Sequence, residues 1–215
     1  MRTTPSRTAE YPCVLANLLK LHDQNPDPRK VREVLRVLNR DGLVVCPTDT
    51  VYSFAAKLGS PKAFDRLARA KGIKAEKAEF SLLCADLSDL SKYAQHLSNP
   101  LFKVMKRALP GPYTFILPAS SEVPKLYRSR KKTIGIRVPD HPVALHLLRE
   151  IGTPLVVSSV HDEDEVLEYT TDPELICERH GRMVDLVIDG GIGQLEASTV
   201  LDCTSGEPEL VRQGL

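Results

Sequence analysis

Apolar residues early in the chain change from helical to extended spacing. The i, i+3, i+4, i+7 spacing of an amphipathic helix is followed by Val31, Val34, Leu35 and Leu38. The next apolar run, 43–46, is short and stops at Pro47, and extended character resumes at 51–57. We therefore expect a helix and then two strands joined by a loop at 47–50.

Helical and extended patterns keep alternating over the rest of the chain. Helices are expected at 62–70, 87–93, 99–108, 142–150 and from Asp172-Pro173 onward. Strands are expected near 18–22, 80–84, 113–117, 133–138, 155–158, 184–188, 198–202 and 209–212. No internal repeat or Gly/Ser linker interrupts this order. The pattern predicts one α/β domain with a mixed sheet over residues 18–215, preceded by a loosely ordered leader at 1–17.

Composition is that of a globular protein. The chain has 215 residues, of which 42% are hydrophobic and 27% are charged, and this balance argues against a membrane protein and against a disordered chain. The formal net charge is only +1. Any attraction to nucleic acid must therefore come from local clusters of Lys and Arg.

Cysteine usage and the apolar runs indicate the compartment. The cysteines are scattered, with no C-x-x-C pair and no His at zinc-ligand spacing, and they are Cys13, Cys46, Cys84, Cys177 and Cys203. A reducing environment is the simplest interpretation. No run approaches the roughly 20 apolar residues of a spanning helix, and the leader lacks the pattern of a signal peptide. We predict a cytoplasmic protein with no membrane partner and no metal site built from protein side chains.

Hydroxyl side chains follow or begin several expected strands. They occur in the Pro-Thr-Asp-Thr loop at 47–50, at Ser158-Ser159 and at Ser198-Thr199. Ligands of open α/β sheets usually lie beyond strand ends, so these segments could converge on one cleft. The alternative for the 47–50 loop is a turn stabilised by its own Asp and Thr side chains.

Familiar nucleotide and nucleophile motifs are absent. The sequence has no G-x-x-x-x-G-K-[ST] loop, no G-x-G-x-x-G fingerprint and no G-x-S-x-G elbow. The glycines at 190, 191 and 193 are interpreted as a tight turn in preference to a phosphate-binding nest. His141 and His161, the histidines nearest the candidate loops, are interpreted first as structural or surface residues.

Basic residues cluster most densely just before the strand at 133–138. The cluster contains Arg128, Arg130, Lys131 and Lys132. It is either a solvated face or an edge that binds a polyanion, because clustered cations gain affinity for phosphates by releasing counterions. Aromatic residues are only 5% of the chain, so a platform for stacking single-stranded bases is poorly supported. The acidic run at 162–165 is interpreted as an exposed loop.

Taken together, several ordered segments resemble one family. They are Pro-Thr-Asp-Thr-Val-Tyr at 47–52, Leu-Pro-Gly-Pro-Tyr-Thr at 109–114, Ile-Arg-Val-Pro-Asp-His-Pro at 136–142, Val-Asp-Leu-Val-Ile-Asp-Gly-Gly at 184–191, Ser-Thr-Val-Leu-Asp at 198–202 and Val-Arg-Gln-Gly at 211–214. This set resembles the YrdC/YciO family of threonylcarbamoyl-AMP synthases and their relatives, over about residues 18–215.

The resemblance implies a fold and a reaction. Family synthases combine L-threonine, bicarbonate and ATP into threonylcarbamoyl-AMP, which is used in tRNA threonylcarbamoyladenosine modification, and their fold is a twisted sheet with a broad basic concave face. By resemblance, Thr48, Thr50 and Tyr52 would line the threonine end. Lys71 and Arg137 would be the catalytic cations that neutralise phosphate and carboxylate charge. The nucleotide, ATP or AMP, would be held by Ser158, Ser198, Thr199 and Arg212. Mg²⁺ would accompany ATP as substrate.

Three departures separate this chain from the family synthases, and two segments, Ser-Leu-Leu-Cys at 81–84 and Tyr-Thr-Phe-Ile-Leu at 113–117, resemble the YciO-type branch. Family synthases usually read Lys-x-Arg where this chain has Lys71-Gly72-Ile73, and an alkyl side chain cannot bind phosphate. They usually read Ser-Ala-Asn where this chain continues Ser158-Ser159-Val160. Ser53 replaces the glycine that normally follows the tyrosine. A non-catalytic protein that binds double-stranded RNA or tRNA through the same surface is the alternative function.

Overall fold

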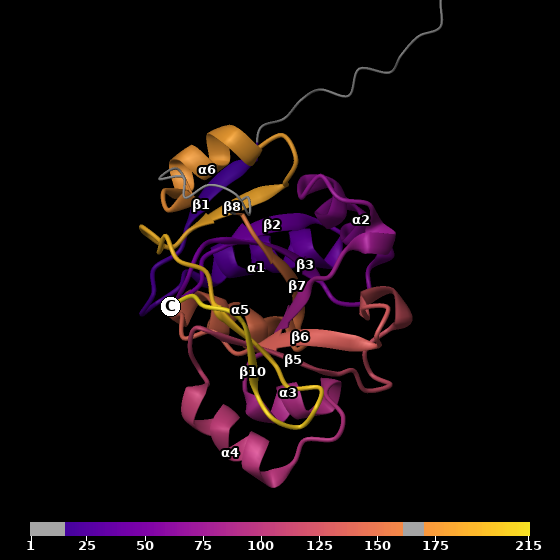
Figure 1. Ribbon diagram of the computed structural model, residues 1–215. Helices are drawn as coiled ribbons and strands as arrows, with labels where there is room; N and C mark the ends of the chain where they lie inside the picture. The colour runs from indigo at the N-terminus through magenta and orange to yellow at the C-terminus, as the bar shows by residue number, and fades with distance from the viewer. Residues whose placement is uncertain (1–15, 161–169) are drawn as a thin grey trace, which may run out of the picture.

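The computed structural model describes residues 16–160 and 170–215 (Figure 1). Its strands are β1 (Asn17–Lys20), β2 (Leu43–Cys46), β3 (Ser53–Lys57), β4 (Ser81–Leu83), β5 (Tyr113–Pro118), β6 (Thr133–Arg137), β7 (Leu155–Ser159), β8 (Leu186–Asp189), β9 (Thr199–Asp202) and β10 (Glu209–Arg212). Its α-helices are α1 (Pro28–Asn39), α2 (Pro61–Ala70), α3 (Leu87–Tyr93), α4 (Asn99–Ala108), α5 (Pro142–Ile151) and α6 (Pro173–His180). Two 3₁₀ turns are η1 (Ala75–Lys77) and η2 (Lys125–Tyr127).

All the strands of the described segments join one mixed sheet. The spatial order is β1-β8-β2-β3-β7-β4-β6-β5-β9-β10. The sheet contains parallel pairs, such as β4 with β6 and β5 with β9, and antiparallel pairs, such as β3 with β7 and β5 with β6. The predicted α/β class with a mixed sheet is confirmed. None of the helices in the described residues is long and apolar enough to cross a membrane.

Local capping fixes where the helices begin and end. The side chain of Asp27 accepts from the backbone N–H of Arg29 at the start of α1, and Ser60 accepts from Ala63 at the start of α2. After α2, the left-handed Gly72 ends the helix, and the N–H of Ile73 donates back to Ala68 O. This is the usual hydrogen-bond pattern of a glycine-terminated helix.

Two hydrophobic layers cover opposite faces of the sheet. On one face, α1 and α5 pack through Val34, Leu38 and Leu147 against alternate residues of β2, β3, β4, β7 and β8. On the other face, α2, α3, α4 and α6 contribute to a larger core that contains Phe54 and Phe115. Figure 1 shows α6 beside β1 and β8, with α3 and α4 toward the opposite end of the molecule. The helices α1 and α5 leave part of their face of the sheet open.

The predicted elements agree with the structure apart from their ends. The strand expected at 51–57 begins at Ser53, and the strand expected at 18–22 is Asn17–Lys20. The first fifteen residues of the predicted leader, together with His161 and the acidic run at 162–165, lie outside the described residues. The turn expected at 190–193 is present, with Gly191 at φ +92° and its N–H bonded to the carboxylate of Asp189.

Candidate functional site

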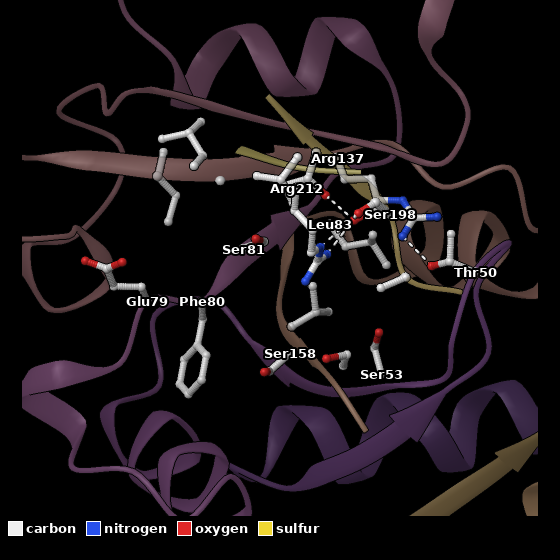
Figure 2. A pocket seen from close by; sticks show the side chains of 18 of the residues that line it. Thr50, Ser53, Glu79, Phe80, Ser81, Leu83, Arg137, Ser158, Ser198 and Arg212 are labelled. Carbon is white, nitrogen blue, oxygen red and sulfur yellow. Dashed lines mark hydrogen bonds between the residues drawn. The ribbon is translucent and has the colours of Figure 1, made fainter. Parts of the chain in front are cut away.

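A cavity of about 280 Å³ opens on the face of the sheet that carries α1 and α5, in the part that these helices do not cover. Successive side chains of a strand point to opposite faces, and alternate residues such as Ser81 and Leu83 on β4 line this space. Figure 2 shows the lining side chains around the hollow. The lining polar residues include Thr48, Thr50, Ser53, Ser81, Thr114, Ser129, Thr133, Arg137, Ser158, Ser159, Ser198 and Arg212.

The hollow exists because its floor carries small side chains. Ser53 faces Ser159 across β3 and β7, and Ser81 faces Gly135 across β4 and β6. A Cβ atom at Gly135 would lie 2.5 Å from Ser81 Oγ and 3.3 Å from Thr114 Cγ2. A side chain at position 135 would therefore require the Ser81 hydroxyl to move.

Arg137 is the buried cation of the site. It lies on β6 with only 6% of its surface exposed, yet its guanidinium reaches the cavity wall. Nη2 contacts Asp49 Oδ1 at 2.5 Å, Nη1 donates to Thr50 Oγ1 at 2.6 Å and Nε donates to Gly111 O at 3.3 Å. Burial lowers the pKa of Arg137, and the Asp49 carboxylate opposes this by stabilising the charged form.

The Pro-Thr-Asp-Thr loop is internally hydrogen-bonded as well as bound to Arg137. Thr48 Oγ1 donates to Val51 O at 2.8 Å, accepts from the N–H of Thr50 and lies 3.1 Å from Thr50 Oγ1. The second oxygen of Asp49 is buried and has no hydrogen-bond partner among the described residues. A hydrogen-bonded turn and a ligand-binding loop are thus compatible interpretations of this segment, because the hydrogen bonds of the turn hold the hydroxyls at the cavity wall.

Arg212 is the exposed cation of the site. Its Nε and Nη2 both donate to the carbonyl oxygen of Ser198, at 3.3 and 2.9 Å. The Ser198 hydroxyl lies 2.8 Å from Thr114 Oγ1, and Figure 2 draws these contacts as dashed lines. Arg212 is close enough to Arg137 for its charge to contribute to the lowered pKa of that guanidinium. Two positive charges therefore act on one cavity, and this favours an anionic ligand.

Two predicted site residues face away from the cavity. The Tyr52 side chain is fully buried, and its hydroxyl donates to Gly191 O at 2.6 Å and accepts from the N–H of Gly190. The Thr199 hydroxyl donates to Leu215 O at 2.8 Å. Neither side chain lines the cavity. Their hydrogen bonds instead connect neighbouring segments of the chain.

The remaining predicted cation, Lys71, stands at the C-cap of α2 and is not among the lining residues. Ile73, two residues on, is 40% exposed. Val160, at the place where synthases usually carry Asn, is buried in the core, and its N–H donates to Tyr52 O. Thus the departure at Ile73 lies on the surface, and the departure at Val160 lies in the core.

The basic cluster at 128–132 forms a tight turn before β6. Arg128 donates through Nε to Val123 O at 2.7 Å and through Nη2 to Ser121 O at 3.2 Å, so two of its N–H groups are used within its own loop. Arg130, Lys131 and Lys132 are exposed. A second hollow lined by Arg128 and Arg130 shares Ser129 and Glu79 with the main cavity. The start of the cluster, residues 128–130, therefore adjoins the cavity.

His141 lies behind the Pro-Thr-Asp-Thr loop and is half-buried. A Cβ atom at Gly190 would meet both His141 and Pro47, which shows how closely these segments approach. Burial lowers the pKa of His141, while the carboxylates of Asp23, Asp49 and Asp140 raise it. Its Nδ1 has no hydrogen-bond partner among the described residues.

Some lining residues were not predicted from the sequence. The sequence marks Ser53 only as a departure from the family, and no motif marks Ser81 or Gly135 as a site residue. Their signal was available in principle, since small residues at alternate positions of neighbouring strands leave space on one face. Among the described residues, no group of three or more His, Cys, Asp or Glu side chains could hold a metal ion.

The fold and the cavity define a class: a mixed α/β domain with an open sheet face, small hydroxyl side chains and two arginines. A family model described as "Telomere recombination", whose name joins Sua5, YciO and YrdC, matches residues 36–214. The chain belongs to this Sua5/YciO/YrdC family.

Two kinds of relatives illustrate the family. YciO of Escherichia coli K12 is 36% identical over 94% of this chain and 97% of its own length, and the crystal structure of E. coli YciO superposes with a TM-score of 0.87. The threonylcarbamoyl-AMP synthase of Nitrosococcus oceani is 30% identical over 77% of this chain and 88% of its own length. Sua5 of Pyrococcus abyssi, solved with L-threonine, gives a TM-score of 0.83 at 27% identity and covers 93% of this chain. This chain spans 58% of that Sua5 chain.

Proposed function

We propose that the cavity binds an adenine nucleotide and L-threonine, and that the protein forms threonylcarbamoyl-AMP from L-threonine, bicarbonate and ATP for tRNA modification in the cytoplasm. The observation that carries this proposal is the pairing of Arg137 and Arg212 over a floor of hydroxyl groups. It is supported by relatives that are threonylcarbamoyl-AMP synthases and by the Sua5 structure that contains L-threonine.

The two arginines would have different roles. Three guanidinium nitrogens of Arg137 already donate to protein oxygens, and Asp49 partly neutralises its charge. Arg137 therefore supplies a fixed positive wall and holds the hydroxyl of Thr50 at the threonine end. Arg212 donates to a single carbonyl oxygen, so its remaining N–H groups can bind a phosphate or carboxylate.

Catalysis in this proposal is positioning and charge neutralisation. The carbamate oxygen of N-carboxylated threonine attacks the α-phosphorus of ATP, and pyrophosphate leaves. The hydroxyls of Ser158 and Ser198 orient the nucleotide, and the cations lower the cost of bringing anions together. Mg²⁺ belongs to the ATP substrate in this scheme. Lys71 stays in the proposal as a charge for phosphates that extend past the cavity rim.

The test is pyrophosphate release that depends on both threonine and bicarbonate. Arg212→Gln removes the available charge from an exposed position, so we expect about a ten- to hundredfold loss, the worth of a charge-assisted hydrogen bond. Thr153→Val is the matched control, because the Thr153 hydroxyl is buried without a hydrogen-bond partner and lies outside the cavity lining. Wild-type protein that releases no pyrophosphate at saturating substrate, yet binds AMP, would remove the catalytic part of the proposal.

RNA binding is a second candidate function, favoured by the exposed cations Arg130, Lys131 and Lys132 in the turn whose Ser129 lines the cavity. Each duplex phosphate contact steepens the dependence of log affinity on log salt by about 0.9. Changing these three residues to Gln should flatten that slope for tRNA or double-stranded RNA. The control changes three exposed cations of α4, Lys103, Lys106 and Arg107, by the same total charge. Equal effects of the two triple variants would refute a specific RNA edge.

A further inference from the structure

The chain from the last residue of β10 onward lies across the residues that enter β9. We call residues 212–215 the clip. Gly214 N donates to Thr199 Oγ1 at 3.0 Å, Thr199 Oγ1 donates to Leu215 O at 2.8 Å and Leu215 N donates to Ala197 O at 3.0 Å. Arg212 adds two hydrogen bonds to the carbonyl oxygen of Ser198, the residue between Ala197 and Thr199. The Thr199 hydroxyl is thus the hub of the clip.

Gly214 allows the clip to lie close to the backbone of Ala197 and Ser198. A Cβ atom at this position would stand 2.1 Å from Ala197 O, 2.7 Å from Ser198 C and 2.8 Å from Ser198 O. All three are backbone atoms, so no side-chain rotation relieves the overlap. Any other residue must lift the clip away from β9.

The Ser198 carbonyl is fixed from the other side as well. The N–H of Thr199 donates to Pro112 O at 2.9 Å, and the Ser198 hydroxyl lies 2.8 Å from Thr114 Oγ1. Since the Arg212 guanidinium rests on this carbonyl through two N–H groups, the position of the carbonyl sets the direction of the remaining N–H groups. Preorganised donors bind an anion better than donors that must first be ordered.

We propose that Thr199 and Gly214 are positioning residues, which hold the Arg212 guanidinium in place for an oxyanion of the ligand. This inference rests on the proposed function. It differs from the assignment of Thr199 to the nucleotide, because the hydroxyl is already used by the clip and acts on the ligand only through Arg212. The oxyanion is either a phosphate or a carboxylate.

The decisive variant is Thr199→Val, which keeps the shape and removes the hydroxyl. Calorimetric titration with AMP and with adenosine separates the phosphate from the rest of the nucleotide, and L-threonine with L-threoninol separates the carboxylate. We expect affinity for one anionic ligand to fall about two- to tenfold, as for one lost hydrogen bond, with its uncharged partner unchanged. Thr199→Ser should recover the wild-type value, and Thr153→Val should match wild type throughout.

A double-mutant cycle with Arg212→Gln tests the route of the effect. If Thr199 acts through Arg212, Thr199→Val adds nothing in the Arg212→Gln background. Full additivity, or equal weakening of the charged and uncharged ligands, overturns the proposal. Gly214→Ala should reproduce the loss for the anionic ligand that Thr199→Val shows.

A ligand-free readout separates this inference from the proposed function. The Arg212 Nε–H resonance, assigned by its absence in Arg212→Gln, should exchange with water about two- to tenfold faster in Thr199→Val than in wild type. Wild-type protein that binds none of the four ligands would refute the proposed function and the role of Arg212 in binding. Unchanged exchange in Thr199→Val would refute the clip as a positioning device, whatever the protein binds.

Discussion

Asp49→Asn should be among the most destabilising single changes at the cavity wall. The Asp49 and Arg137 side chains are 12% and 8% exposed, and the carboxylate is the charge that compensates this guanidinium. The amide keeps the volume of Asp49 but removes the charge, and it places an NH₂ where a carboxylate oxygen now stands. Removing one partner of a buried ion pair leaves the other charge uncompensated.

The expected cost lies at the lower end of the range for such changes, about 3 kcal/mol, because Thr50 and Gly111 still accept from Arg137. For a domain of this size that corresponds to a fall in Tm of about 6–12 °C. Urea unfolding of the wild-type and variant proteins measures the difference directly.

Arg66→Gln provides the comparison that isolates burial. The Arg66–Asp185 pair is almost as short, at 2.6 Å, but its side chains are 35% and 39% exposed. Exposed pairs contribute about 0–1 kcal/mol, so Arg66→Gln should change stability little. Equal losses for Asp49→Asn and Arg66→Gln would refute the argument that burial, and not distance, sets the worth of the Asp49–Arg137 pair.

Three further predictions concern the surroundings of the cavity. Tyr52→Phe should cost about 1–3 kcal/mol in urea unfolding, because Gly191 O and Gly190 N lose their hydroxyl partner; an unchanged midpoint would contradict this. The pKa of His141 is lower in the folded protein than in the unfolded chain, so stability should fall as the pH drops below about 6.5 and through the folded pKa. His141→Gln should reduce this pH dependence of stability. A variant with the wild-type pH profile would exclude His141 as its source. Gly135→Ala should cost about 1–3 kcal/mol of stability through overlap with Ser81 Oγ and should weaken AMP binding. Adding Ser81→Ala should recover part of the stability and part of the AMP affinity. A double variant no better than Gly135→Ala alone would argue against that overlap.

Periodicity predicted nearly every element of the fold, because local spacing and capping are recorded in short stretches of sequence. The helical spacing after Pro28 and the Asp172-Pro173 helix start are examples, and both appear as α1 and α6. The ends of strands were less well determined. Residues 51 and 52 have extended character, but pairing with β7 begins only at Ser53, since a strand end is set by its partner.

The candidate site was predicted in part. One cavity is lined by Thr48, Thr50, Arg137, Ser158, Ser198 and Arg212. Tyr52 and Thr199 belong to the same motifs, yet they face neighbouring loops. A motif indicates that a segment lies near the site, whereas the direction of each side chain depends on the strand to which the segment is paired.

The sequence by itself determined the class of fold, the order of elements, the family and the segments that carry polar chemistry, because all of these depend on residues close together in the chain. Only the tertiary structure decided which side chains share the cavity. Arg137 meets Asp49 across 88 positions and Ser198 meets Thr114 across 84. The register of paired strands sets these meetings, and a shift of one residue would turn every side chain to the opposite face of the sheet.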